Sequence, residues 1–263
     1  MDLQLAGKRV FISGSTQGIG YAIAKACLAE GACVVINGRT SDRVAEAVVR
    51  LREETRVDAD AVSGIAADFA DAHQVTALID SLGNVDVLVN SVGVFDIDDF
   101  FDAGDDAWYR YFEINVLSGL RLSRALMPAM LDRGWGRIIF VGTESAVDVP
   151  AAMIPYGASK SASLALSNGL AKLTRGTAVT VNTVLGGPTY SDGVARTVEQ
   201  IAQAQSITAD ELKKSLVRDT SLIQRFIDPS EIASTVAFIA SPRSSAMNGG
   251  AIRADGGVLT TVL

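Results

Sequence analysis

The chain has 263 residues, of which 48% are hydrophobic and 20% charged, and its net charge is −7 at neutral pH. This composition is typical of a compact α/β protein with a substantial core and argues against a disordered chain. The negative charge argues against a nucleic-acid surface. We also expect no membrane span, because no apolar run approaches roughly 20 residues, and no cleaved leader.

The two cysteines and the one histidine limit the kinds of catalytic and metal site that the chain can form. Cys27 and Cys33 are expected to be free, buried thiols, which is typical of a reducing, cytoplasmic setting. His73 is the single histidine, so the sequence excludes a histidine-based triad or a His-rich metal site elsewhere, and we expect no metal. We expect His73 to lie on the surface near a helix start.

Short apolar runs alternate with helical patterns along the chain. Most runs are nearly continuous in Val, Ile, Leu and Ala, as in strands that are buried on both faces of a parallel sheet. The predicted strands are 9–13, 33–37, 62–67, 85–90, 137–141, 179–184 and 251–254. The predicted helices are roughly 18–30, 42–55, 72–82, 105–132, 156–175 and 229–240. This alternation predicts α/β fold class, with a doubly wound sheet in a single domain, 1–263.

Residues 188–228 interrupt this alternation with two additional helical patterns. The second pattern begins with a capping box, Thr208 to Glu211, and the helix after it begins at Asp228-Pro229. An insertion after the carboxyl end of a strand lies where open α/β sheets bind ligands. The 188–228 segment is therefore predicted to be a substrate lid; a purely structural excursion is the alternative.

The first predicted strand leads into a glycine-rich turn and a helix of small residues. Gly14, Gly18 and Gly20 lack the Gly-x-Gly-x-x-Gly spacing, but they allow a tight turn, close approach to a pyrophosphate and a helix N-terminus aimed at that anion. The turn is therefore predicted to bind a dinucleotide, with turn formation alone as the alternative. Its predicted contacts are Gly14, Ser15, Thr16, Gln17, Gly18, Ile19 and Gly20.

The end of the second predicted strand indicates which dinucleotide binds. A carboxylate there would bind the ribose 2′-hydroxyl of NAD(H), but the residue present is Arg39. A guanidinium suits a 2′-phosphate, so the sequence favours NADP(H) over NAD(H), with a solvated loop arginine as the alternative. Asp68 is placed to accept a hydrogen bond from the adenine, and the turn Asn90-Ser91-Val92-Gly93 allows close approach near the ribose.

Tyr156 lies four residues before Lys160 at a predicted helix start, and Thr143 lies thirteen residues before Tyr156 at the end of a strand. Positions i and i+4 share one face of a helix. A lysine ammonium beside a phenol favours the phenolate, and a positively charged cofactor favours it further. The pair predicts proton transfer at an alcohol or carbonyl oxygen, with an exposed helical pair as the alternative.

These motifs together resemble the short-chain dehydrogenase/reductase family over about residues 5–257. The resemblance is carried by Gly14…Gly18-Ile-Gly20, Asp68, Asn90-Ser-Val-Gly93, Asn115, Tyr156-Gly-Ala-Ser-Lys160, Val181-Asn-Thr-Val-Leu and Asp255-Gly-Gly. It implies a Rossmann-like fold with a seven-stranded parallel sheet, hydride transfer between a nicotinamide cofactor and a carbonyl or alcohol, and a homodimer or homotetramer.

The resemblance also implies roles for single residues. Tyr156 is expected to be the general acid/base, and Lys160 to lower its pKa and bind the nicotinamide ribose. Asn115 is expected to hold a water in a proton relay, and Thr143 to bind the substrate oxygen. Further expected cofactor contacts are Phe69, Ser91, Gly93, Gly187 and Thr189.

Three positions depart from the family pattern. Thr143 replaces the usual serine; its methyl group restricts χ1 and crowds the substrate, and Ser145 is the alternative oxygen-binding hydroxyl. Ser91 and Val92 alter the turn after the fourth strand. Gly186 stands where the family often has proline, which loosens the loop before the 188–228 segment.

The predicted function is that of an NADP(H)-dependent carbonyl reductase acting on a small, mostly apolar substrate. Ser145 and Tyr190 are tentative substrate contacts. An NAD-dependent alcohol dehydrogenase of the same family and a non-catalytic nucleotide-binding sensor are the alternatives. We expect no nucleic-acid or membrane partner and a homo-oligomeric assembly.

Overall fold

The computed structural model describes residues 1–96, 100–205 and 207–262. Seven parallel strands form one sheet in the order β3-β2-β1-β4-β5-β6-β7. The strands are β1 (Arg9–Ile12), β2 (Cys33–Gly38), β3 (Val62–Ala66), β4 (Val87–Asn90), β5 (Trp135–Thr143), β6 (Ala178–Gly186) and β7 (Ala251–Ala254). The predicted doubly wound α/β sheet is confirmed, and the seven predicted strands match these with shifts of at most two residues at an end.

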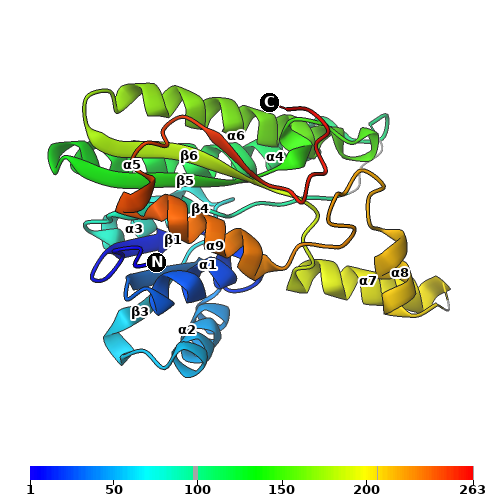
Figure 1. The fold of residues 1–263 in the computed structure, drawn as a ribbon, viewed down its shortest axis with the longest axis horizontal. Helices are drawn as coiled ribbons and strands as arrows, with labels where there is room; N and C mark the ends of the chain where they lie inside the picture. Colours follow the sequence, from blue (N-terminus) through cyan, green and yellow to red (C-terminus); the bar gives the residue numbers. More distant parts are fainter. Residues whose placement is uncertain (97–99, 206, 263) are drawn as a thin grey trace.

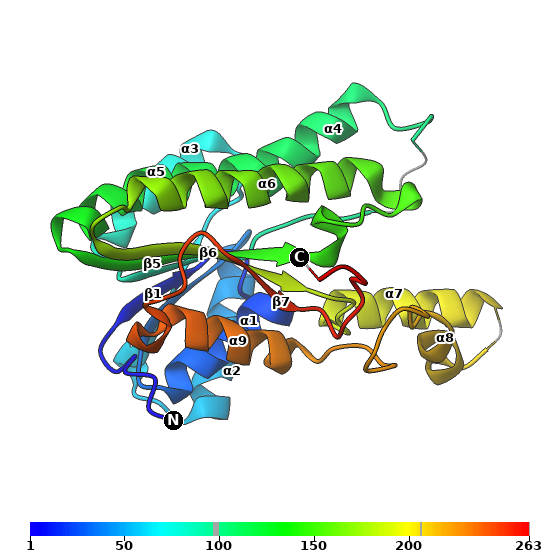
Figure 2. The same ribbon diagram turned by 45° about the horizontal axis from the view of Figure 1, so that its top comes forward.

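Helices cover both faces of the sheet (Figures 1 and 2). One face carries α1 (Gly18–Ala29), α2 (Ser41–Thr55) and α9 (Pro229–Ala240). The other carries α3 (Ala72–Leu82), α4 (Asp105–Phe112), α5 (Ser118–Asp132) and α6 (Ile154–Leu173). The predicted helix 105–132 is one continuous rod in which a π-helical turn, Glu113–Leu117, separates α4 from α5.

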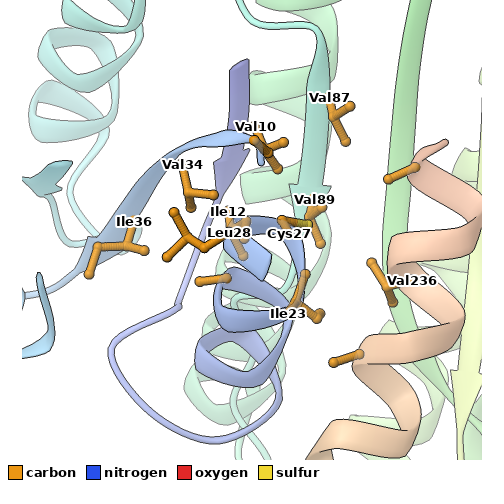
Figure 3. Packing of buried hydrophobic residues seen from close by; sticks show 14 of the residues in the cluster. Val10, Ile12, Ile23, Cys27, Leu28, Val34, Ile36, Val87, Val89 and Val236 are labelled. Atoms are coloured by element: carbon orange, nitrogen blue, oxygen red, sulfur yellow. The ribbon is translucent and has the colours of Figure 1, made fainter. Parts of the chain in front are cut away.

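Alternate residues of the strands pack into two hydrophobic cores. Val10 and Ile12 of β1 face α1 and α9, whereas Phe11 faces α3 and α5. Figure 3 shows the first core, in which Ile23 of α1 and Val236 of α9 approach the valines and isoleucines of β1, β2 and β4. Because both faces of each strand are buried, the apolar runs are continuous rather than alternating with polar residues.

The 188–228 segment contains α7 (Asp192–Gln205) and α8 (Ala209–Ser215), which lie beyond the edge of the helical layers (Figure 1). The predicted capping box forms, since the hydroxyl of Thr208 accepts from the Glu211 N–H. Asp228 is the N-cap of α9, as predicted, and it also forms a capping box in which Glu231 accepts from the Asp228 N–H. The excursion between β6 and α9 is therefore helical, as predicted.

Two smaller expectations have mixed outcomes. Cys27 is buried and free, but Cys33 is exposed, so the expectation of a buried thiol is wrong there: Cys33 is the first residue of β2 and the one residue of that strand outside the core. His73 is exposed in the first turn of α3, as expected. Within the described ranges, no helix combines the length and apolar character needed to cross a bilayer.

Candidate active site

A cavity of about 810 Å³ lies at the carboxyl ends of the strands. Its walls are the glycine turn after β1, the ends of β2, β5 and β6, the loops after β3 and β4, the start of α6 and parts of the 188–228 segment. The chain changes direction across the sheet between β1 and β4, and open α/β sheets bind ligands outside such a switch point.

Steric limits explain the glycine turn. Gly14 has φ +63°, and a Cβ there would lie 2.8 Å from the Cα of Val92 in the loop after β4. A Cβ at Gly20 would lie 2.4 Å from the Gly14 carbonyl oxygen. The glycine turn, the loop after β4 and the start of α1 therefore pack at backbone distance, and only glycine fits at these two positions.

Asn37, near the end of β2, links the glycine turn to the end of β3 through its side-chain amide. Its Oδ1 accepts from the Gly14 N–H at 3.1 Å, and its Nδ2 donates to the Ile65 carbonyl at 3.1 Å and the Ala67 carbonyl at 3.3 Å. The side chain is 1% exposed. This role could not be predicted from the sequence, because Asn37 bonds to segments that only the folded sheet brings beside it.

The end of the cavity next to β2 and β3 carries two arginines. Arg39 and Arg43 both line it and both are exposed, one after β2 and one in the first turn of α2. Arg43 was not predicted; its spacing of four residues from Arg39 was the available signal. Asp68 and Phe69 also line this end, and the Asp68 carboxylate accepts from the Ala70 N–H at 3.0 Å.

The catalytic candidates meet at the opposite end. Thr143 ends β5, and Tyr156 and Lys160 lie on the first turns of α6, where Pro155 occupies an early helical position. All three line the cavity. The Tyr156 ring packs edge-on against Phe95 with ring centroids 6.2 Å apart, and Lys160 Nζ donates to the Val141 carbonyl at 3.2 Å.

Burial dominates the protonation of both groups. The pKa of Tyr156 is raised to about 12, mainly because the phenolate would lose its hydration; the hydrogen bond with Thr143 lowers the pKa and the charge of Glu144 raises it. Burial lowers the pKa of Lys160 to about 8. The direction for Tyr156 is opposite to that expected from the lysine, so a lowered pKa requires a further positive charge, such as that of an oxidised nicotinamide.

Asn115 lies in the π-helical turn, and such turns are frequent at functional sites. Its Oδ1 accepts from the Val94 N–H at 2.8 Å, and its Nδ2 donates to the Val94 carbonyl at 3.0 Å and to Ser159 Oγ at 2.9 Å. Both amide hydrogens are therefore used within the protein. The side chain fixes the loop after β4 against α6; holding a water stays a prediction.

Glu144 and Arg218 are two charged residues of the cavity wall that the sequence reasoning missed. Glu144 follows Thr143 and is 3% exposed, and its Oε1 lies 3.0 Å from the Arg218 guanidinium in the 188–228 segment. The sequence predicts a mostly apolar substrate and no charged pair beside it. The sequence places Glu144 next to Thr143, but 74 positions separate it from Arg218, and only the fold pairs them.

Four predicted site residues do not line the cavity. Ser15 is fully buried and bonds to Ile12 and Asn37, and Asn90 points toward Ser123 of α5. Asn115 lies behind the wall. Tyr190 packs on Phe226, with ring centroids 5.6 Å apart. The other predicted residues line it: Gly14, Thr16, Gln17, Gly18, Ile19, Gly20, Arg39, Asp68, Phe69, Ser91, Gly93, Thr143, Ser145, Tyr156, Lys160, Gly187 and Thr189.

Comparison with known proteins identifies the family of this chain and several relatives. The family model described as short chain dehydrogenase matches residues 8–202. An uncharacterized oxidoreductase of Bacillus subtilis, YvrD, is 42% identical over 268 residues, covering 100% of both chains. The 2-keto-3-deoxy-L-fuconate dehydrogenase of Xanthomonas campestris is 33% identical and covers 97% of this chain and 81% of its own.

The fold is also similar to solved structures. The L-sorbose reductase of Gluconobacter frateurii, complexed with NADPH and L-sorbose, superimposes with a TM-score of 0.94 at 32% identity, covering 100% of both chains.

Proposed function

Because the chain belongs to the short-chain dehydrogenase/reductase family, we propose that it transfers a hydride between NADP(H) and the carbonyl, or the corresponding secondary alcohol, of a small substrate. One observation carries the proposal: the Thr143 hydroxyl, the Tyr156 phenol and the Lys160 ammonium line one cavity together with the glycine turn.

The residues present fit a dinucleotide. The glycine turn and the start of α1 line the cavity, and a helix N-terminus at such a turn is a site that binds a pyrophosphate. Arg39 and Arg43 would hold a 2′-phosphate, and Lys160 would bind the nicotinamide ribose beside Gly93, whose added Cβ would lie 3.2 Å from Lys160 Nζ. The bound cofactor supplies the hydride or accepts it.

The protein's own groups manage charge and protons. During reduction the carbonyl oxygen gains negative charge, and Thr143 and Tyr156 are the hydroxyls placed to donate to it. Tyr156 then gives its proton to that oxygen, and Lys160 stabilises the phenolate that remains. In oxidation the same phenolate removes the alcohol proton.

The preference for NADP(H) is supported by two cations at the adenosine end of the cavity, where NAD-binding relatives of this fold place a carboxylate. The NADPH complex of the similar L-sorbose reductase agrees with it. NAD-dependent alcohol oxidation is the alternative and predicts higher affinity for NAD(H) than for NADP(H).

The substrate we propose is a small carbonyl compound enclosed by the 188–228 segment as a lid. Phe95, Val194 and Phe226 give the cavity apolar wall, whereas Glu144 and Arg218 add a polar one. Hydroxylated ketones therefore belong in the test set beside apolar ketones and aldehydes. The L-sorbose reductase and the ketodeoxyfuconate dehydrogenase act on hydroxylated compounds, as their names state.

The assembly we propose is a homotetramer. Tyr109, Phe112 and Leu173 on α4 and α6 are 70%, 38% and 65% exposed, and Val262 in the tail is 95% exposed. Subunit contacts would cover this apolar surface. Light scattering tests the proposal directly, and a monodisperse monomer would contradict it.

The test of function is a cofactor-consumption screen. Purified protein is mixed with NADPH or NADH and a panel of aldehydes, apolar ketones and hydroxyketones including L-sorbose, and absorbance at the nicotinamide band is followed. Turnover with NADPH supports the proposal. Tight NADPH binding without turnover of any carbonyl in the panel, or of the corresponding alcohols with NADP⁺, would support a sensor instead.

A further inference from the structure

Glu144 is a buried carboxylate of the cavity wall; it directly follows β5 and is the first residue of the 3₁₀ turn Glu144–Ala146. It is 3% exposed. Burial of an ionised carboxylate is costly unless hydrogen bonds and a counter-charge compensate for the lost hydration. The neighbours of Glu144 therefore indicate which groups stabilise its charge and which groups its charge affects.

Both carboxylate oxygens have partners. Oε2 accepts from the Thr143 hydroxyl at 2.6 Å, a short O–H···O⁻ distance that is typical of a strong charge-assisted bond. Oε1 accepts from Ser145 Oγ at 3.2 Å and lies 3.0 Å from the Arg218 guanidinium. Oε2 thus binds the hydroxyl of Thr143, which is the group proposed to bind the substrate oxygen. Oε1 is bound by Arg218 of the 188–228 segment.

The orientation of Thr143 follows from this bonding. Its oxygen accepts from the Ser145 N–H at 3.2 Å, and its hydrogen is directed to Glu144. A hydroxyl has one hydrogen and two lone pairs, so these two bonds leave one lone pair of Thr143 unused. When a carbonyl oxygen enters, Thr143 can turn its hydrogen from Oε2 to the substrate, while Ser145 and Arg218 continue to hold Oε1 of Glu144.

We propose that Glu144 is a positioning residue that couples the 188–228 segment to the reacting groups: Arg218 holds the carboxylate, and the carboxylate orients the Thr143 hydroxyl beside Tyr156. This inference rests on the proposed function for its catalytic meaning, whereas the coupling itself does not depend on it. Arg218 is 32% exposed at its side chain, so its pairing with Glu144 is partly protected from solvent.

The charge of Glu144 also bears on proton transfer. It raises the pKa of Tyr156 and so favours the protonated phenol, which is the form that donates to a carbonyl. The other charged or titratable groups that line the same cavity near it are Arg218, Lys160 of α6 and Arg110 of α4. The side chain of Asp148 on the same loop is exposed.

The first experiment measures the coupling without turnover. Hydrogen–deuterium exchange of the backbone at 209–221 is compared in the wild type, Glu144→Gln, Arg218→Met and Lys214→Met. Lys214 is an exposed lysine of α8, and its variant is the matched control for loss of one positive charge. We expect at least threefold faster exchange in the first two variants and no change in the control. Equal exchange in all four proteins would overturn the coupling.

The second experiment measures the pH dependence of alcohol oxidation with NADP⁺ and the alcohol product of the best panel substrate. Glu144→Gln should move the midpoint of the rise in rate to lower pH, by about half a unit or more. Arg218→Met should move it to higher pH, because the carboxylate keeps its charge but loses its counter-charge. The double variant should resemble Glu144→Gln.

The two experiments distinguish the structural coupling of Glu144 to the 188–228 segment from its electrostatic effect on Tyr156. Shifts of the same sign in both single variants would refute the electrostatic role, even with changed exchange. If no panel compound turns over, the proposed function fails, and the exchange experiment still decides whether Glu144 and Arg218 couple the segment to the site.

Discussion

The carboxylate of Asp192 accepts a hydrogen bond from the backbone N–H of Gly18 at 2.8 Å, although the two residues are 174 positions apart. Asp192 is the first residue of α7, and Gly18 is the first residue of α1. The neighbouring Arg196 donates to Gln17 Oε1 at 2.7 Å. An anionic group of the 188–228 segment thus contacts the N–H group at which we propose that the pyrophosphate binds.

This relationship gives the first prediction. A bound pyrophosphate would meet the Asp192 carboxylate at the same N–H, so Asp192→Asn should bind NADPH several-fold more tightly, because charge repulsion is removed. Fluorescence titration at low and moderate salt measures the effect. Asp210→Asn, at an exposed position in the first turn of α8, is the control and should change nothing. Weaker binding in Asp192→Asn would contradict the placement of the pyrophosphate.

Tyr156→Phe should abolish turnover, by about a thousandfold or more, because the site loses its proton donor and acceptor. NADPH affinity should remain within about twofold, since the phenyl ring keeps its packing against Phe95. Steady-state assays and fluorescence titration provide the two readouts. Tyr190→Phe is the matched control, because Tyr190 does not line the cavity; loss of turnover there would show that its hydroxyl contacts the substrate.

Arg39→Ala should weaken NADPH binding about tenfold or more and leave NADH binding nearly unchanged, because a bidentate contact to the 2′-phosphate is lost. Arg43→Ala should act in the same direction, and the double variant should lose most of the discrimination. Arg175→Ala removes an exposed cation from another part of the surface and serves as the control. Equal losses for both cofactors would refute the assignment of Arg39.

Lys160 should reduce the stability of the cofactor-free protein at neutral pH. Its pKa is lowered from 10.5 to about 8 by burial, so the charged form is disfavoured in the folded state. Lys160→Met should therefore be more stable at pH 7, by about 2 kcal/mol after allowance for the lost bond to Val141, and it should be inactive.

The lowered pKa of Lys160 also makes the stability of the wild-type protein depend on pH. Between pH 8 and 10.5 the unfolded chain binds the proton that the folded chain has released, so wild-type stability rises with pH across this window. The advantage of Lys160→Met should shrink in parallel. Denaturant unfolding at pH 7 and pH 10 measures both effects, with Lys172→Met, an exposed lysine on the same helix, as control. An advantage that is constant with pH would contradict the buried charge.

Local chemistry made most of the fold predictable. The continuous valine and isoleucine runs predicted buried parallel strands, and the capping residues Thr208 and Asp228 marked two helix starts that the structure confirms. Such signals depend on neighbouring residues only. For the same reason the π-helical turn at Asn115 was not predicted, since it arises where α4 and α5 join and pack against α6.

Within the site, the sequence by itself determined which chemical groups are present and their order along the chain: the glycine turn, Arg39, Thr143, Tyr156 and Lys160. The tertiary structure decided what surrounds them. The partners of Gly14, Glu144 and Gly18 are Asn37, Arg218 and Asp192, and each comes from a different element. Burial and charge pairing depend on the path of the whole chain. The upward shift of the Tyr156 pKa therefore follows from the fold and not from the spacing between Tyr156 and Lys160.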